Sequence, residues 1–296
     1  MTSTLSRRAL LPLALALSLA SCSDEVQGGE KTLKFTAIPG ENTAEMIEKF
    51  GLVAAHLETQ LGVPVEYVHV SDYGASVEAF KNGDVLLSWF GGLTGCQARN
   101  AVKGARAIAQ GKIDPSYKSY FIANADSGLE PGDSFPAAIA DKTFTFGSDS
   151  STSGRLMPEY FIRQNTGKSP AEFLGSEMKF SGGHDQTWQL VQDGSFDAGV
   201  LSYKTYDTRL AEGKIDPNKC RIIWTTPPYP DYSWNAHPDL DTNFGEGFTD
   251  KLQATLIAIE DEALLGAMMR KEGMISATNE DFTPLEELAR ELDLLR

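Results

Sequence analysis

The sequence has 296 residues, of which 41% are hydrophobic, and its 41 acidic and 26 basic side chains give a formal net charge of −15 at pH 7. That length is enough for two ordinary lobes or one large domain, with apolar cores. So acidic a chain is unsuited to nucleic acid, which requires clustered Lys and Arg. A small anion is not excluded, because backbone N–H groups and helix dipoles act locally.

The N-terminus has the pattern of a targeting segment. Arg7 and Arg8 precede an apolar run, 9–20, that is too short to span a bilayer but has the length of a signal-peptide core. The run ends in Leu19-Ala20-Ser21-Cys22, which resembles the lipobox of bacterial lipoproteins. The resemblance implies that Cys22 carries the lipid and becomes the new N-terminus. The alternative is an ordinary signal peptide in which Cys22 is incidental.

We therefore expect residues 1–22 to be a lipoprotein signal peptide. Residues 23–31 are polar and contain glycine, which indicates a flexible tether. The body is then expected on the periplasmic or cell-surface side of the membrane, which it contacts through its lipid anchor only.

The first half of the body alternates strand-like and helical runs. The expected strands are 33–38, 63–70, 85–90 and 105–110, and the expected helices are 42–61, 75–81 and 94–102. Gly62 follows the last apolar position of the first helix and marks its end. This βαβα order favours a parallel sheet covered by helices.

The second half repeats the pattern after a strand-like run, 117–124. The expected strands are 142–148, 178–182, 196–202 and 221–226, and the expected helices are 153–164, 185–192 and 205–212. Short echoes recur in order between the halves, such as Phe35-Thr36 with Phe144-Thr145, and Gly111 to Pro115 with Gly213 to Pro217. A segment rich in Pro and aromatic residues, 224–234, then leads to expected helices at 251–259, 261–271 and 284–295.

These halves predict two α/β lobes. The first lobe would contain residues 32–117 and 226–296, and the second residues 118–225. Two crossings between lobes make a hinge, and the cleft beside such a hinge closes around a small ligand. The carboxyl ends of the strands would point into that cleft.

A run of hydroxyl side chains is the sharpest local signal. Gly147 to Gly154 reads Gly-Ser-Asp-Ser-Ser-Thr-Ser-Gly and lies between an expected strand and an expected helix. Unpaired N–H groups and a partial positive charge at a helix start, with added hydroxyls, suit a tetrahedral oxyanion. The alternative is a well-capped helix start, for which one hydroxyl is enough.

Three motifs together carry a resemblance to a known family. The hydroxyl run, the segment Trp89-Phe90-Gly91-Gly92-Leu93 and the turn Ser181-Gly182-Gly183-His184-Asp185 resemble the phosphonate/phosphite-type, PhnD-like periplasmic binding proteins. The resemblance implies the two-lobed type II periplasmic-binding fold with a ligand cleft at the hinge. It also implies delivery of a small oxyanion to an ABC permease and ATPase complex, with no cofactor, no metal and no catalysis.

The resemblance also implies the site. The family's oxyanion clamp falls on Ser151, Thr152 and Ser153, its aromatic after the second strand on Tyr73, and its imidazole donor on His184. The segment that begins at Trp89 would line the cleft from the first lobe, and Ser202 and Tyr203 occupy a strand end where other members place a ligand-reading side chain. The aromatic residues Tyr229, Tyr232 and Trp234 either wall the cleft or pack the hinge, and packing is favoured.

One physical criterion separates the candidate oxyanions. A ligand that keeps a proton, such as phosphite or a phosphonate, is selected by a carboxylate acceptor, whereas sulfate or selenate requires donors only. Asp149 and Asp185 are candidate acceptors, or they point to solvent or cap helices. The runs FTAIPGENTAEMIEKFG and WFGGLTG also resemble a branch of the family proposed to carry selenate, so phosphonate, phosphite and selenate stay open.

Two other classes of function compete. A ligand-sensing module of a membrane receptor would use the same fold. A periplasmic phosphoester hydrolase is less favoured, since the sequence has no His-Glu-x-x-His or Gly-x-Ser-x-Gly motif and no histidine pair at helical metal spacing. Cys96 and Cys220 either pair or are two buried thiols, and the second is favoured.

Overall fold

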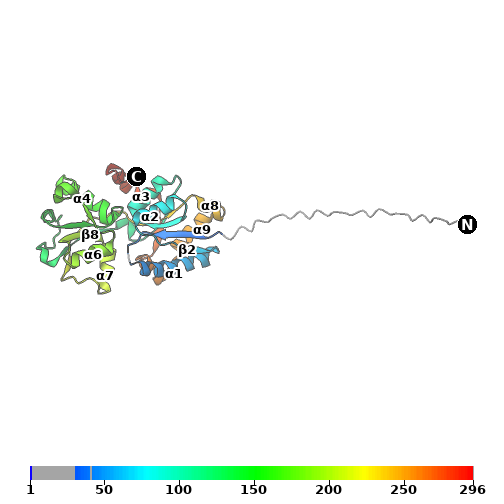
Figure 1. Cartoon of the computed structure of the whole chain (residues 1–296), viewed down its shortest axis with the longest axis horizontal. Helices are drawn as coiled ribbons and strands as arrows, with labels where there is room; N and C mark the ends of the chain where they lie inside the picture. Colours follow the sequence, from blue (N-terminus) through cyan, green and yellow to red (C-terminus); the bar gives the residue numbers. More distant parts are fainter. Residues whose placement is uncertain (2–30, 41, 296) are drawn as a thin grey trace.

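A computed structural model describes residues 1, 31–40 and 42–295, so Cys22, the expected signal peptide after residue 1 and most of the expected tether lie outside the described residues. Figure 1 shows two α/β lobes side by side, joined by segments that cross between them. In the described ranges, no helix combines the length and the apolar character needed to cross a membrane.

The sheet of the first lobe has six strands in the order β11-β4-β10-β3-β1-β2. These strands are β1 (Leu33–Ala37), β2 (Val65–Tyr67), β3 (Leu87–Phe90), β4 (Arg106–Gly111), β10 (Ser233–Ala236) and β11 (Met274–Ser276). Its helices are α1 (Thr43–Leu61), α2 (Tyr73–Lys81), α3 (Gly92–Ala101), η1 (Asp114–Ser116), α8 (Asp239–Phe244), α9 (Phe248–Ile257), α10 (Glu262–Ala267), η5 (Asn279–Phe282) and α11 (Thr283–Glu291).

The sheet of the second lobe has five strands in the order β7-β6-β8-β5-β9. These strands are β5 (Ser119–Asn124), β6 (Phe144–Phe146), β7 (Lys179–Phe180), β8 (Ala198–Ser202) and β9 (Cys220–Thr225). The helical segments are η2 (Ala125–Ser127), η3 (Ala137–Asp141), the π-helical turn η4 (Thr152–Leu156), α4 (Met157–Thr166), α5 (Pro170–Leu174), α6 (His184–Gln192) and α7 (Tyr203–Ala211).

The α/β class is confirmed, but the expectation of a parallel sheet was wrong in part. The strands β1, β2 and β3 are parallel, and so are β6, β7 and β8. Strand β10 lies antiparallel between β3 and β4, and β11 is antiparallel to β4. Strand β5 is antiparallel to both β8 and β9. Both sheets are mixed because each receives a strand that the chain contributes after crossing between lobes.

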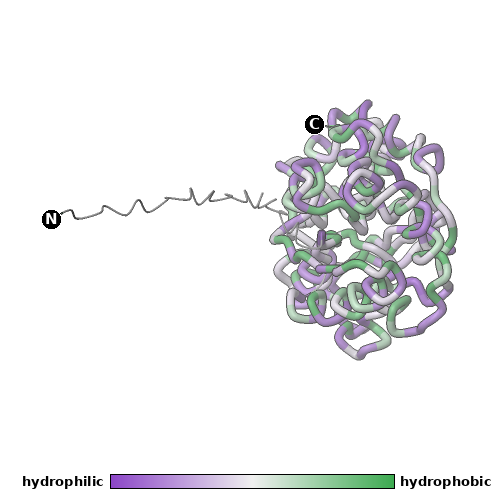
Figure 2. The backbone as a smooth tube through the Cα atoms, turned by 90° about the vertical axis from the view of Figure 1, so that its right-hand side faces the viewer, coloured by the Kyte–Doolittle hydropathy of each residue, from purple (hydrophilic) through white to green (hydrophobic). Residues whose placement is uncertain are grey.

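Helix α1 illustrates why these elements form. The Asn42 side chain accepts a hydrogen bond from the Ala44 amide at its start, and Gly62 ends it with a positive φ of 75°. Its buried residues lie on one face and join the first lobe's core; they are Met46, Phe50, Val53, Ala54, Leu57 and Leu61. In Figure 2 the backbone changes between hydrophilic and hydrophobic colours within most elements, as expected for amphipathic helices packed on sheets.

The two crossings pair with each other. The Tyr117 amide donates to the Tyr229 carbonyl over 2.8 Å, and the Tyr229 amide donates back to the Tyr117 carbonyl over 3.0 Å. The Tyr229 hydroxyl lies 2.5 Å from the Ser119 hydroxyl. Tyr229 therefore packs at the hinge. The lobe limits at 117/118 and 225/226 stay a prediction.

The remaining residues of interest in the fold are the cysteines and two aromatics. Cys96 and Cys220 are both buried and free, so they do not pair. Trp234 is fully buried in the first lobe's core, opposite Trp89 across the strand pair. Tyr232 is half-buried against that core and also lines a pocket described below.

Candidate ligand-binding site

Helix starts from both lobes meet in the cleft. Helix α2 begins at Tyr73 and α3 at Gly92 in the first lobe, while η4 begins at Thr152 and α6 at His184 in the second. Each follows a strand of a parallel group, so these starts share the carboxyl-end edge of their sheet. Helix starts carry unpaired N–H groups and partial positive charge, so their meeting favours an anion although the chain is acidic.

The hydroxyl run forms the second lobe's side of the site. Ser151, Thr152 and Ser153 are all buried. Ser151 Oγ accepts a hydrogen bond from the Gly154 amide at 2.9 Å and so caps η4. A Cβ on Gly154 would lie 3.0 Å from the Gly147 Cα, so this loop needs glycine at both positions.

The next two hydroxyls do more than cap a helix. Thr152 Oγ1 accepts a hydrogen bond from the Leu93 amide of the first lobe at 2.9 Å. Ser153 Oγ lies 3.4 Å from His184 Nε2. The alternative reading, a helix cap, therefore applies to Ser151, while Thr152 and Ser153 face other elements of the cleft.

His184 is a buried, neutral imidazole. Its Nδ1 accepts the Ser202 amide hydrogen at 3.4 Å, which leaves the proton of the neutral ring on Nε2, toward Ser153. Burial lowers the pKa of His184 to about 4, and the nearby Asp185 charge only partly opposes this. The ring is therefore a neutral N–H donor at pH 7.

Tyr73 supplies a second neutral donor from the first lobe. Its ring is buried, and its hydroxyl oxygen has no hydrogen-bond partner among the described residues. Burial raises the pKa of Tyr73, and the Asp231 charge raises it further, so the hydroxyl keeps its proton. The hydroxyl would lie 4.0 Å from a Cβ on Gly40, which lines a pocket beside His184.

Asp231 is a site residue that the sequence analysis did not identify. It is fully buried, and its Oδ1 accepts the Gly92 amide hydrogen at 2.7 Å. Its Oδ2 is buried without a partner among the described residues. Burial raises the pKa of Asp231 to about 7, although hydrogen bonds from Gly92 and Thr152 oppose the rise. The only sequence signal was an acidic residue between the aromatics of 224–234.

The two carboxylates considered from the sequence are placed differently. Asp149 is exposed, and its Oδ1 lies 3.4 Å from the hydroxyls of Ser148 and Ser150. Both oxygens of Asp185 are hydrogen-bonded, Oδ1 to Trp188 and Arg209 and Oδ2 to Arg209. Asp231 is thus the carboxylate with a free oxygen at the meeting point of the helix starts.

Ser202, Tyr203 and Trp89 support the site from its edges. The Ser202 hydroxyl lies 2.5 Å from the Tyr117 hydroxyl at the hinge. The Tyr203 ring packs against Tyr117 with ring centres 4.8 Å apart. Trp89 is buried at the end of β3 and stacks on Tyr232 with ring centres 5.6 Å apart.

A cavity of about 50 Å³ adjoins His184. Aromatic and apolar side chains dominate its lining, which includes Ile38, Phe50, Trp89, Tyr117, Tyr232 and Met268. Arg270 also lines it, held by Asp114 through Nε at 2.8–2.9 Å, with its guanidinium carbon 4.5 Å from the Tyr232 ring centre. A space of this size holds only a few waters.

A family model described as the ABC transporter, phosphonate, periplasmic substrate-binding protein matches residues 35–282. The chain belongs to this family. The probable ABC transporter phosphite binding protein PhnD1 of Prochlorococcus marinus (strain MIT 9301) is 37% identical over 280 residues, 93% of this chain and 94% of that protein. The phosphate-import protein PhnD of Mycolicibacterium smegmatis is 32% identical over 232 residues, 72% of this chain and 70% of that protein.

Solved structures of similar proteins have the same fold. The structure of the Prochlorococcus PhnD1 in complex with methylphosphonate matches with a TM-score of 0.84 and 38% identity, covering 89% of this chain and 99% of that one. A Pseudomonas aeruginosa binding protein of an ABC phosphonate transporter, 18% identical with a TM-score of 0.75, shares the fold. The two-lobed type II periplasmic-binding fold is therefore confirmed, and the family makes this a periplasmic binding component of an ABC transporter. The relatives are binding and import proteins, which fits a chain that is not an enzyme.

Proposed function

We propose that this protein is a lipid-anchored component of an ABC importer that captures phosphite or a small phosphonate as a monoanion carrying one proton. The observation that carries this proposal is the buried Asp231 carboxylate, with Oδ1 bonded to Gly92 and Oδ2 without a partner among the described residues. The protonated oxygen of such a ligand would donate its hydrogen bond to Oδ2. A hydrogen bond to an ionised acceptor is among the stronger ones in proteins.

The ligand's unprotonated oxygens would be bound by neutral donors. Ser151 and Ser153 of the hydroxyl run, Tyr73 of α2 and His184 of α6 come from three different turns and are all buried at the helix starts. Buried donors aimed at one point bind an oxyanion well because they lose little freedom and little solvent when the ligand enters.

The fourth substituent on phosphorus would face the aromatic wall of Trp89 and Tyr232. A hydrogen or methyl group is compatible with such a wall, whereas the fourth oxygen of phosphate would lose its hydrogen bonds to water there. The small cavity disfavours long substituents, and the Arg270 charge disfavours a ligand amine. These features support phosphite and methylphosphonate over phosphate and aminophosphonates.

Selenate and sulfate are unsuited to the same site. Both are fully ionised at neutral pH, so neither has a proton to donate to ionised Asp231. Both are also weak bases, so their oxygens are poor acceptors of a hydrogen bond from the protonated form of Asp231. We therefore propose phosphorus oxyanions rather than selenate, in line with the PhnD1 relative that is named a phosphite binding protein.

Titration calorimetry of the lipid-free body tests the proposal. The panel is phosphite, methylphosphonate, phosphate, 2-aminoethylphosphonate, sulfate and selenate at pH 7. We expect phosphite or methylphosphonate to bind at one per chain and at least about 100-fold more tightly than sulfate and selenate. This difference in affinity corresponds to the loss of one charged hydrogen bond together with charge repulsion. Equal or tighter binding of selenate would overturn the assignment, and tightest binding of phosphate would overturn the role of the aromatic wall.

A further inference from the structure

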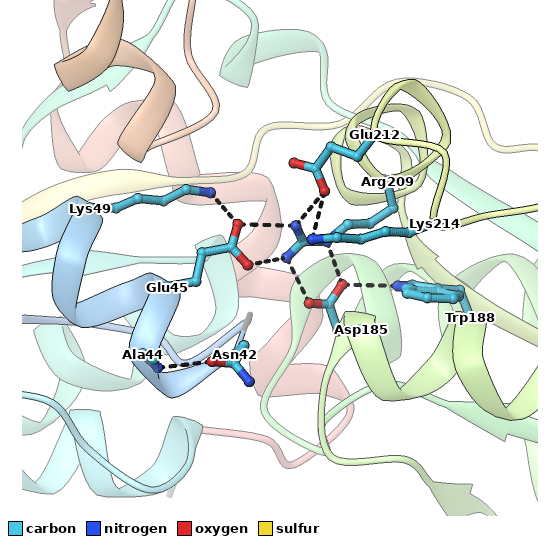
Figure 3. A network of polar contacts seen from close by, with 9 residues as sticks. All are labelled: Asn42, Ala44, Glu45, Lys49, Asp185, Trp188, Arg209, Glu212 and Lys214. Carbon is cyan, nitrogen blue, oxygen red and sulfur yellow. Dashed lines mark hydrogen bonds and ion pairs between the residues drawn. The ribbon is translucent and has the colours of Figure 1, made fainter.

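A polar network links the ligand site to the opposite lobe. Figure 3 shows Arg209 of α7 between Asp185 of α6 and Glu45 of α1. The Arg209 side chain is 1% exposed. It donates to both oxygens of Asp185, from Nε at 2.9 Å and from Nη2 at 2.7 Å. A planar guanidinium bound in this paired way fixes the direction of its partner as well as its distance.

The same guanidinium reaches the first lobe. Nη1 lies 3.1 Å from Glu45 Oε1 and Nη2 lies 3.2 Å from Glu45 Oε2. Glu45 lies in the first turn of α1 and is also bonded to Lys49 at 2.9 Å. A third carboxylate, Glu212, accepts from Nη1 at 2.8 Å but belongs to the same lobe as Arg209.

Asp185 makes this network part of the binding site. It directly follows His184, and both lie in the first turn of α6, where Trp188 also donates to Asp185 at 2.9 Å. Whatever fixes Asp185 therefore fixes the turn that carries the imidazole donor.

We propose that Arg209 is a positioning residue of the ligand site, which holds the first turn of α6 through Asp185 and binds that turn to α1 through Glu45 when the lobes are closed. This goes beyond the proposed function and rests on it only for the binding measurements below. The consequence is a slower release of ligand, since the lobes must break the Glu45 contacts before they part.

The charges suit a contact that is made and broken repeatedly. Three carboxylates, Glu45, Asp185 and Glu212, meet three cations, Lys49, Arg209 and Lys214. If the lobes part, Glu45 stays with Lys49, while Arg209 and Lys214 stay with Asp185 and Glu212. Neither side is then left with an unbalanced buried charge, which would otherwise oppose opening.

Matched variants of the carboxylates test the proposal, because replacing the buried Arg209 itself would leave Asp185 unpaired. Glu45→Gln removes the charged contact between lobes, and Glu212→Gln removes a charged contact to the same Nη1 within one lobe. The dissociation rate of methylphosphonate, or of phosphite if that binds more tightly, is measured by stopped-flow fluorescence. We expect Glu45→Gln to speed dissociation roughly tenfold with association changed less than about twofold, and Glu212→Gln to change both less than about twofold.

A third variant tests whether the loss of any ion pair between the lobes has the same effect. Lys204 and Glu272 also pair between lobes at 3.1 Å, but Glu272 is 42% exposed, so Glu272→Gln should have little effect. Equal acceleration by Glu45→Gln and Glu212→Gln, or none by Glu45→Gln, would overturn the proposal.

A measurement without ligand separates this proposal from the proposed function. Small-angle X-ray scattering of the free protein should give a larger radius of gyration for Glu45→Gln than for the wild type, and an unchanged value for Glu212→Gln. If the wild type binds none of the oxyanions, the proposed function fails, while the scattering comparison still decides whether Arg209 and Glu45 hold the lobes together. Identical scattering of all three proteins would count against the proposal.

Discussion

Asp231 Oδ1 and the Gly92 amide nitrogen lie 2.7 Å apart, where a buried carboxylate meets the start of α3. The helix start stabilises the ionised carboxylate, yet burial outweighs that effect and raises the pKa of Asp231 to about 7. The site therefore contains a carboxyl group that gains or loses its proton near neutral pH.

Asp231→Asn should weaken phosphite and methylphosphonate binding about 10- to 100-fold, because the charged acceptor of the ligand proton is lost. The amide has nearly the same shape and can also donate a hydrogen bond, so binding of sulfate and selenate should improve. Calorimetry with all four anions checks both changes. A variant that loses every anion equally would point to a disrupted site instead.

Ligand affinity should also depend on pH in a defined direction. The proposed complex holds one proton between the ligand and Asp231. Above about pH 8 both partners are ionised when free, so binding must take up a proton and the dissociation constant should rise about tenfold per pH unit. Asp231→Asn should flatten this rise, which titrations between pH 6 and pH 9.5 would reveal. A wild-type affinity that is constant over this range would contradict the prediction.

The same carboxyl affects the stability of the free protein. Its pKa rises from 3.8, the ordinary value, to about 7 on folding. Its contribution to the free energy of unfolding is therefore fully present below about pH 4 and is lost as the pH rises through 7. The melting temperature of the wild type should fall relative to that of Asp231→Asn between pH 5 and pH 8, measured without ligand. A constant difference between the two proteins would contradict this.

Ser151→Ala combined with Thr152→Ala should abolish measurable binding. The double variant removes hydroxyls on the second lobe's side of the site and the contact from Thr152 to the Leu93 amide. Calorimetry provides the measurement. Ser151 is also a helix cap, so Ser169→Ala, which removes the cap of α5 away from the cleft, is the matched control. It should cost about 1 kcal/mol of stability and leave affinity unchanged.

The proposed anchor depends on Cys22. In a bacterial host, Cys22→Ser should move the protein from the membrane fraction to the soluble periplasmic fraction and prevent labelling by a fatty-acid analogue, because the acylated sulfur is missing. Immunoblots of fractionated cells provide the measurement. Labelling that persists in the variant would exclude Cys22 as the attachment point.

Much of the fold and part of the site could be predicted because their signals are local. The hydroxyl run, the turn before His184 and the apolar spacing of α1 each lie within a short segment, and the structure brings Ser153 and His184 to 3.4 Å. The assignments of Ser151, Thr152, Ser153, Tyr73 and His184 to a ligand stay predictions until binding is measured.

The rest of the fold and of the site depends on contacts between segments that are distant in the sequence. Strand β10 has four residues and follows a segment rich in proline, so neither its pairing with β3 nor the position of Asp231 was visible in the sequence. The sequence left Asp185 as a candidate proton acceptor. Its partner Arg209 lies 24 residues away along the chain, so the sequence did not show that the two side chains pair. Glu45 and Arg209 are 164 residues apart, and no local pattern relates them.

The paired backbone of Tyr117 and Tyr229 has a further consequence for how the site forms. Two extended segments bonded to each other bend and twist easily, but they resist sliding, since sliding would break both hydrogen bonds at once. The lobes can therefore rotate apart without losing their relative register. Each closure returns Thr152 to Leu93 along the same arc, so the binding site is rebuilt without a search among alternative alignments.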